Sequence, residues 1–253
     1  MENSVNKFNI IDIHSHIIYG IDDGSESIDM SAKLMGMAYE QGVRGIFCTN
    51  HSYGMEDAYK DYHRRFEKLR KVAEKQYPGL ALYKGCEIAA WKDKMEEIIT
   101  GIRNDVYPSM NGTDYVLMEF SPHRTDGMRE MIYCLDYALN KGYIPIIAHV
   151  ERYETLYDDP LQDMLRIKEL GCLIQINLYS IEQDQGLVGG GSRKELANMF
   201  LHNRLVDFVG TDTHRLDYKS PEAAVGAAAL RKKYGAEYAD AVLYQNAEKM
   251  LIR

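Results

Sequence analysis

Short apolar runs rich in β-branched residues alternate with amphipathic segments along almost the whole chain, and this alternation limits the possible folds more than any other feature. The pattern predicts seven strands, at 8–13, 43–49, 81–88, 115–120, 143–150, 172–178 and 206–210. The segments between them carry apolar residues every three or four positions, as helices that cover a sheet do. These predicted helices span 28–41, 57–76, 93–101, 129–141, 161–170 and 193–203. The order predicts an α/β protein with a parallel sheet, either open or closed into a barrel.

The sequence favours one domain over residues 1–253. With 253 residues and 45% apolar content, the chain is long enough to bury the core of a single large barrel. No Pro/Ser-rich linker or long-period repeat divides it, and residues 189–191 read as a flexible glycine loop before a helix. Residues 221–253 are expected to add helices at the C-terminus.

Charge and cysteine content exclude several classes of function. The 30 Lys and Arg residues are outnumbered by 38 Asp and Glu residues, and a net charge of −8 disfavours nucleic acid and anionic membranes as partners. The four cysteines show no C-x-x-C spacing, which argues against a disulfide framework or a structural zinc site. No apolar stretch approaches the roughly 18 residues of a membrane span, so no membrane insertion and a cytoplasmic location are expected.

Polar residues that can bind metal ions stand where most of the predicted strands end. Parallel α/β folds place their active sites at this edge. The residues come from six of the seven strands: His14 and His16, His51, Glu87, Glu119, His149 with Glu151 and Arg152, and Asp212 with His214. So many titratable groups in one cavity would carry a large desolvation and repulsion cost without cations. The set therefore predicts a metal centre.

The type of ligand indicates the kind of metal and reaction. An H-x-H pair such as His14 and His16 would be a weak signal alone, but in extended chain both imidazoles reach the same side and one cation. Imidazole and carboxylate without thiolate favour Mn, Fe or Zn in a hydrolytic role. Two or three such ions can clamp a phosphoryl group and lower the pKa of a water to generate hydroxide. Hydrolysis of a phosphate ester is the predicted reaction.

Seven motifs give these residues a specific resemblance that covers nearly the whole chain in order. They are D-I-H-S-H-I at 12–17, G-I-D-D-G at 20–24, T-N-H at 49–51, G-C-E-I at 85–88, M-E-F at 118–120, A-H-V-E-R-Y at 148–153 and T-D-T-H at 211–214. The series resembles the bacterial capsule-type, manganese-dependent tyrosine-protein phosphatases of the polymerase and histidinol phosphatase (PHP) superfamily. H-x-H alone indicates only the superfamily, whereas I-D-D-G and A-H-V-E-R-Y resemble the phosphatase branch.

The resemblance implies a distorted (β/α)7 TIM-like barrel, the PHP fold, with two or three Mn²⁺ ions, Fe or Zn being alternatives. The implied ligand sets are His14, His16, Glu87 and Asp212 for one ion, Glu87, Glu119 and His149 for a second, and Asp23, His51 and His214 for a third. Arg152 would be the catalytic phosphate-binding residue, a role that its planar guanidinium suits independently. Lys219 stands near the position of a second arginine of the family, so one phosphate contact would be made at a single point or come from another residue. The implied partner is a phosphotyrosine protein, namely a bacterial tyrosine autokinase that controls capsular or extracellular polysaccharide synthesis.

Other polar residues receive different interpretations. His63 and His202 are expected on helix surfaces, whereas His123 and Arg124 could line the pocket rim. Asp22 is expected to form a turn beside the ligand Asp23, although the two could exchange roles. A tyrosine that stacks on a substrate ring is possible, but the sequence does not identify it among 19.

Two other functions remain open from the sequence. A small-molecule phosphatase of the histidinol-phosphate type would use nearly the same metals, and a non-catalytic metal-binding domain would need no phosphate-binding arginine. The absence of a C-x5-R loop excludes the cysteine-dependent route and predicts direct attack by metal-activated hydroxide.

Overall fold

Parallel strands and surrounding helices alternate through the computed structural model, which describes residues 8–54, 58–120, 127–153, 157–183 and 193–251. The strands are β1 (Ile10–Ser15), β2 (Val43–Cys48), β3 (Ala81–Lys84), β4 (Glu87–Ala89), β5 (Tyr115–Glu119), β6 (Ile144–Ile147), β7 (Leu173–Asn177) and β8 (Phe208–Gly210). The helices are α1 (Ile28–Glu40), α2 (Tyr59–Gln76), α3 (Met95–Arg103), α4 (Met128–Asn140), α5 (Pro160–Glu169), α6 (Arg193–His202), α7 (Ala224–Tyr234), α8 (Ala236–Asp240) and α9 (Asn246–Glu248), with a π-helical segment at Ala241–Gln245. The six predicted helices lie within two residues of their expected ends, and residues 221–251 contain further helices as expected. Local sequence explains two helix starts: the Ser27 side chain accepts from the Met30 N–H at the start of α1, and Asp159 accepts from the Gln162 N–H at the start of α5.

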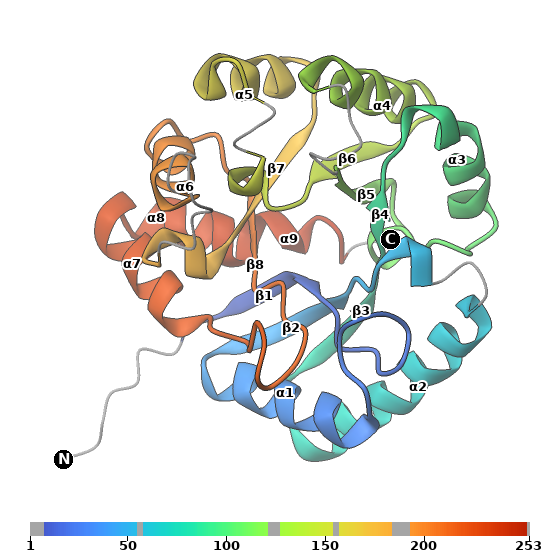
Figure 1. The fold of residues 1–253 in the computed structure, drawn as a ribbon. Helices are drawn as coiled ribbons and strands as arrows, with labels where there is room; N and C mark the ends of the chain where they lie inside the picture. The colour runs from blue at the N-terminus through green and yellow to red at the C-terminus, as the bar shows by residue number, and fades with distance from the viewer. Residues whose placement is uncertain (1–7, 55–57, 121–126, 154–156, 184–192, 252–253) are drawn as a thin grey trace.

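The strands form two parallel sheets that meet at two seams. One sheet has the order β1-β2-β3 and the other β4-β5-β6-β7-β8, and every pairing is parallel. Isolated parallel bridges join Ser15 to Thr213 at one seam and His51 to Glu87 at the other. Figure 1 shows helices placed around the two sheets on all sides. The expected α/β fold with a distorted, barrel-like arrangement of parallel strands is confirmed.

The strand predicted at 81–88 is broken in two, which corrects the expectation of seven continuous strands. β3 pairs with β2 and β4 pairs with β5, with Gly85 and Cys86 between them. The fully buried Tyr62 from α2 occupies the break, where its hydroxyl contacts the Cys48 and Gly85 carbonyls at 2.8 and 2.9 Å and the Gly85 N–H at 3.1 Å. A β-carbon at Gly85 would lie 2.9 Å from the Thr49 side chain, so the break also requires a residue without one. The interruption places Glu87 at the seam between the two sheets.

Two apolar clusters hold this framework together. The larger one packs the helices against the strands. The smaller one lies among the strands and receives two residues from the C-terminal segment; its members are Ile11, Ile13, Phe47, Met110, Leu117, Ile146, Ala148, Phe208, Ala247 and Met250. Among the described residues, none of the helices combines the length and apolar character needed to cross a membrane.

Asp12 joins β1 to the end of β8 beneath the polar cluster. Its Oδ1 accepts from the backbone N–H groups of His14 at 3.1 Å and Thr211 at 2.9 Å, and its Oδ2 accepts from the Thr211 hydroxyl at 2.5 Å. Burial raises the pKa of the Asp12 carboxyl to about 6, against the effect of these hydrogen bonds. The carboxyl therefore fixes the strand that carries the H-x-H pair.

Substitution Asp12→Ala is expected to lower the free energy of unfolding by about 2–4 kcal/mol, because it leaves buried donors unsatisfied. Asp12→Asn retains a carbonyl oxygen for the two backbone N–H groups and should cost clearly less. Chemical denaturation of both variants and the parent chain checks this, and equal losses for the two variants would contradict it.

Candidate metal centre

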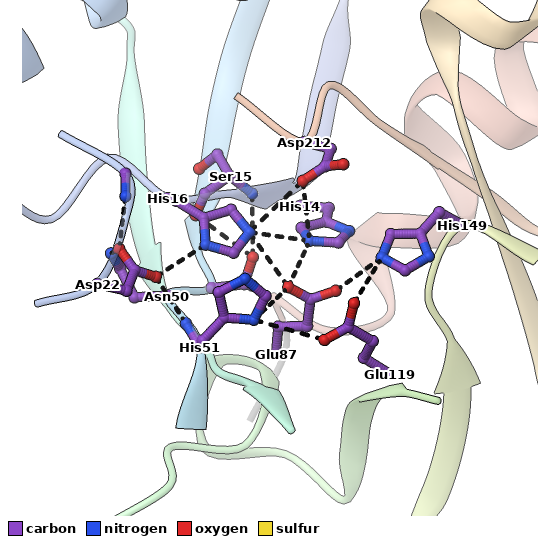
Figure 2. A network of polar contacts seen from close by, with 12 residues as sticks. His14, Ser15, His16, Asp22, Asn50, His51, Glu87, Glu119, His149 and Asp212 are labelled. Atoms are coloured by element: carbon purple, nitrogen blue, oxygen red, sulfur yellow. Dashed lines mark hydrogen bonds and ion pairs between the residues drawn. The ribbon is translucent and has the colours of Figure 1, made fainter. Parts of the chain in front are cut away.

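All nine side chains predicted as metal ligands lie together where the strands end. His14 belongs to β1, Glu87 opens β4 and Glu119 closes β5, while the others follow β1, β2, β6 and β8; these are His16 and Asp23, His51, His149, and Asp212 and His214. Figure 2 shows most of these side chains pointing toward one shared space. Residues far apart in the sequence therefore converge because parallel strands end at the same edge.

Glu87 is the centre of this group. Its Oε2 lies 3.2 Å from Nε2 of both His14 and His16 and 3.0 Å from Nδ1 of His51. Its Oε1 lies 2.9 Å from Nε2 of His149. One fully buried carboxylate thus contacts four imidazoles, as its place at the seam between the sheets permits.

Three further carboxylates lie around the same group of imidazoles. Glu119 lies 3.5 Å from His149 Nε2 and 3.6 Å from His51 Nδ1. Asp212 Oδ1 lies 3.5 Å from Nδ1 of His214, and the same oxygen is within 3.7 Å of the H-x-H imidazoles. Asp23, whose side chain is 61% exposed, lies 3.7 Å from His214 Nε2 and 3.8 Å from His51 Nε2. The cluster is therefore buried at Glu87 and open to solvent at Asp23.

The ligand atoms fall into four overlapping groups, each compact enough to surround one cation: His16, Asp23, His51 and His214; His14, Glu87 and His149; His14, His16 and Asp212; and His51, Glu87 and Glu119. The resemblance predicts three sets with somewhat different membership. In the structure His16 also lies with Asp23, and His51 also lies with Glu119. The same nine residues are involved in both descriptions.

The donor set fits divalent cations. His51 Nδ1 and Glu87 Oε2 are 3.0 Å apart, yet neither forms a hydrogen bond, although both are buried. Buried polar atoms are normally hydrogen-bonded, so atoms that approach without bonding are suited to a cation between them. Imidazole nitrogens and carboxylate oxygens are the donors that Mn, Fe and Zn accept.

The pKa values of the buried histidines also favour a site for divalent cations. Burial by itself lowers the pKa of His14, but Glu87 and Asp212 outweigh it and raise that pKa to about 9. Burial likewise opposes charging of His16, whereas Asp22 and Glu87 raise its pKa to about 9. Without a cation, these imidazoles retain protons to balance the buried carboxylates. Divalent ions would take over that positive charge.

Three other candidate ligands have pKa values shifted toward the neutral form. Burial and Arg152 lower the pKa of His149 to about 3, and burial and His16 lower that of His214 to about 3. Burial and Glu87 raise the pKa of Glu119 to about 7. A neutral imidazole is the form that binds a metal ion.

A second layer of residues fixes the imidazoles, beginning with Asp22. The carboxylate accepts from the His16 ring at Nδ1 and from the His51 backbone N–H, both at 2.8 Å. It also accepts from Gly24 N–H at 3.0 Å and from the Asn50 amide at 2.7 Å. Asp22 therefore forms the expected turn. Its hydrogen bond with His16 Nδ1, which the sequence pattern did not predict, also leaves His16 Nε2 facing the cluster.

β7 supplies no charged ligand but contributes two buried amides. Gln175 Oε1 lies 3.2 Å from His14 Nδ1 and accepts from the His149 N–H at 2.8 Å. Its amide nitrogen donates to Asn177, whose own amide donates to Asp212 Oδ2 at 3.2 Å. The sequence pattern predicts neither Gln175 nor Asn177 as part of the site. The available signal was their alternate spacing on the one predicted strand that does not lead into a metal-competent residue.

Arg152 and Lys219 lie on the far side of the Asp212 carboxylate from the histidines. Asp212 Oδ2 accepts from Arg152 Nη1 at 3.2 Å and from Lys219 Nζ at 2.8 Å. The two side chains are 27% and 15% exposed, so both stand at the boundary between the buried cluster and solvent. Burial opposes the charge on Arg152, whereas Asp212 keeps its pKa above the usual range. The Asp212 carboxylate thus contacts the candidate metal ligands through one oxygen and the positively charged Arg152 and Lys219 side chains through the other.

Three of the six non-glycine residues with positive φ in the described part of the chain lie at this site. His149, Asp212 and Lys219 have φ angles of 34°, 54° and 50°, in the left-handed region that residues with side chains seldom adopt. Surrounding hydrogen bonds hold these conformations; the His214 N–H, for example, donates to the Lys219 carbonyl at 3.0 Å. Strain of this kind is typical of functional sites.

The remaining histidines lie away from the cluster or outside the described residues. His63 contacts the backbone carbonyl of Asp105 at 3.1 Å, and His202 is exposed in the last turn of α6, as expected for surface groups. His123 and Arg124, predicted at the pocket rim, lie outside the described residues.

Known proteins match this chain over nearly its whole length. The family model for capsular polysaccharide synthesis CpsB/CapC matches residues 10–252. The tyrosine-protein phosphatase CpsB of Streptococcus pneumoniae is 32% identical over 96% of this chain and 98% of its own length, and YwqE of Bacillus subtilis, also named a tyrosine-protein phosphatase, is 28% identical over 96% and 91%. A crystal structure from work on YwqE and CpsB, described as unique metal-dependent tyrosine phosphatases, superimposes with a TM-score of 0.79, 27% identity, and coverage of 96% of this chain and 94% of that one. The chain belongs to the CpsB/CapC family of capsular polysaccharide synthesis.

Proposed function

We propose that this chain is a metal-dependent tyrosine-protein phosphatase that acts in the cytoplasm. The observation that carries the proposal is Asp212, whose Oδ1 faces the histidines while its Oδ2 holds Arg152 and Lys219. Metal ions in this cluster, together with the Arg152 and Lys219 side chains beside it, would supply the positive charge that binding a phosphate ester requires. All four cysteines are buried free thiols, which suits a reducing compartment.

The nine clustered side chains would hold two or three Mn²⁺ ions, with Fe or Zn as chemically acceptable replacements. When bound, such ions supply positive charge for the phosphoryl oxygens and make a water nucleophilic near neutral pH. Glu87 is the natural shared ligand, because its two oxygens face different histidines.

The chain's own cations bind and orient the phosphate. Arg152 offers parallel N–H donors to two phosphate oxygens, whereas Lys219 offers a point charge to one. Both already lie against Asp212 Oδ2, so they are held at the edge of the cluster before substrate arrives. Such prior ordering lowers the cost of assembling the transition state.

The proposed substrate is a phosphotyrosine protein, specifically a bacterial tyrosine autokinase that controls capsular or extracellular polysaccharide synthesis. The tyrosine-protein phosphatase names of the relatives support a phosphotyrosine substrate, and the family's description supports the link to capsular polysaccharide synthesis. We also propose that the chain acts as one domain over residues 1–253, in agreement with a family match that runs nearly from end to end.

Asp22→Asn is expected to weaken metal binding by about 10–100-fold, as loss of a carboxylate behind a metal-binding histidine does. The amide cannot accept from both the His16 ring and the His51 N–H with the same strength. Metal titration of the chelated chain measures the effect. Asp217→Asn, at a side chain 83% exposed, is the control and should bind as the parent does. Unchanged affinity in Asp22→Asn would contradict the orienting role.

Chelation followed by addition of a single metal tests the proposed activity. The chelated chain should not hydrolyse p-nitrophenyl phosphate, and Mn²⁺ should restore turnover, with Mg²⁺ and Ca²⁺ as comparison ions. Full turnover in the chelated chain would overturn the metal requirement. Failure of Mn²⁺, Fe²⁺ and Zn²⁺ alike to support any turnover would leave only the non-catalytic metal-binding function.

A further inference from the structure

Two exposed tyrosine rings, Tyr53 and Tyr218, stand beside candidate metal ligands at the open side of the cluster. Their exposed fractions are 58% and 50%. Each ring packs against a different histidine, Tyr53 against His51 and Tyr218 against His214. Large exposed side chains are common singly on protein surfaces, but two aromatic rings at one candidate active site call for a functional explanation.

Tyr53 follows β2 in a short 3-10 turn, Ser52–Gly54, immediately after His51. Its ring stacks on the His51 imidazole with centroids 4.5 Å apart and an interplanar angle of 22°. This contact fixes the direction of the ring, yet more than half of the side chain remains open to solvent. The stack therefore presents a preformed aromatic surface next to the cluster.

Tyr218 belongs to a tight turn after β8. The His214 N–H donates to the Lys219 carbonyl at 3.0 Å, and the Arg215 N–H donates to the Tyr218 carbonyl at 2.9 Å. The Tyr218 ring meets the His214 ring edge-on at 5.8 Å, and Lys219 Nζ lies 5.6 Å from its centroid. The same turn thus positions a phosphate-binding lysine and an aromatic ring.

The two rings mark the solvent side of one ligand group. His51 and His214 have centroids 6.1 Å apart and share a group with Asp23, the most exposed of the nine ligands. A phosphate ester held by Lys219 would direct its leaving group toward solvent, past these rings. Among large exposed side chains in the described part of the chain, the other tyrosine is Tyr133 on α4, outside the cluster.

We propose that Tyr53 and Tyr218 form an aromatic rim that grips the phenyl ring of phosphotyrosine and gives the site its preference for aryl over alkyl phosphates. The inference rests on the proposed function and assigns specificity to two residues. Stacked or edge-on aromatic pairs add binding beyond the area they bury, about tenfold in affinity at most for each ring. An alkyl phosphate gains no such contact.

Calorimetric binding of benzylphosphonate and ethylphosphonate to the Mn²⁺-loaded chain tests this without requiring turnover. The parent should bind the benzyl compound at least tenfold more tightly. Tyr53→Ala and Tyr218→Ala should each reduce that ratio severalfold, and the double variant should bring it near one. Tyr53→Phe and Tyr218→Phe keep the rings and should retain the preference, and Tyr133→Ala should match the parent.

The outcomes separate this inference from the proposed function. A parent that binds both phosphonates equally, or a double variant that retains the full preference, overturns the rim while p-nitrophenyl phosphate turnover still supports the phosphatase. Absence of turnover with every metal overturns the proposed function and the rim that rests on it. Loss of metal in an alanine variant, measured in the same samples, would show that the ring supports its histidine and would overturn the specificity role for that tyrosine.

Discussion

Glu87→Gln is expected to remove at least one metal ion per chain and to reduce phosphatase turnover by about 10³-fold or more, because the bound ions supply most of the charge stabilisation. The substitution changes little in volume but exchanges a carboxylate oxygen for an N–H donor. Four imidazole nitrogens lie within 3.2 Å of the two Glu87 oxygens, so the change affects the surroundings of all four of these histidines. His14 would also lose the main anion that raises its pKa, and His16 would lose one of two, the other being Asp22.

Metal content after gel filtration and turnover of p-nitrophenyl phosphate measure these effects together. Glu67→Gln is the matched control, since its side chain is 49% exposed on α2 and pairs with Arg70. That variant should keep the parent's metal and rate. A Glu87→Gln chain with full metal content and normal turnover would show that Glu87 is not a ligand.

Arg152→Ala should lower kcat by about 10²–10³-fold, the usual loss when one donor to the transition state is removed. Metal content should stay normal, because Asp212 Oδ2 keeps its contacts with Lys219 and Asn177. Arg152→Lys keeps the charge without the planar fork and should recover only part of the rate. Steady-state kinetics, with metal content and thermal unfolding on the same samples, distinguish lost catalysis from lost structure.

The control for Arg152 is Arg70, an arginine that forms ion pairs at the protein surface. Arg70→Ala breaks ion pairs with Glu67 and Glu74 on the outside of α2 and should leave kcat unchanged. Normal kcat in Arg152→Ala would exclude a role for the guanidinium in the reaction. Loss of metal in Arg152→Ala would instead indicate that Arg152 supports metal binding through Asp212.

The nine clustered residues could be predicted because the chain repeats one signal. Polar, metal-competent residues end successive apolar runs, and parallel strands bring their ends to a single edge. His14 and Asp212 are 198 positions apart, yet each lies at the end of a recognisable strand. Strand alternation also predicted the fold class and the positions of the six helices before the C-terminal region.

The features that the sequence pattern did not predict depend on contacts between residues that are far apart in the sequence. The break between β3 and β4 is stabilised by the hydroxyl of Tyr62, which comes from α2 and has no local signature of that role. Gln175 is a neutral amide, and its contacts with His14 and His149 become apparent only in the folded structure. Tyr53 and Tyr218 differ from other tyrosines by exposure beside the cluster, which periodicity does not report.

Hydrolysis of a phosphotyrosine peptide by the Mn²⁺-reconstituted chain, compared with histidinol phosphate at equal concentration, tests the central claim most directly. The proposed function predicts cleavage of the peptide with a clearly higher kcat/KM than for histidinol phosphate, and no cleavage of either after chelation. Preference for histidinol phosphate would contradict it and assign the site to small-molecule substrates.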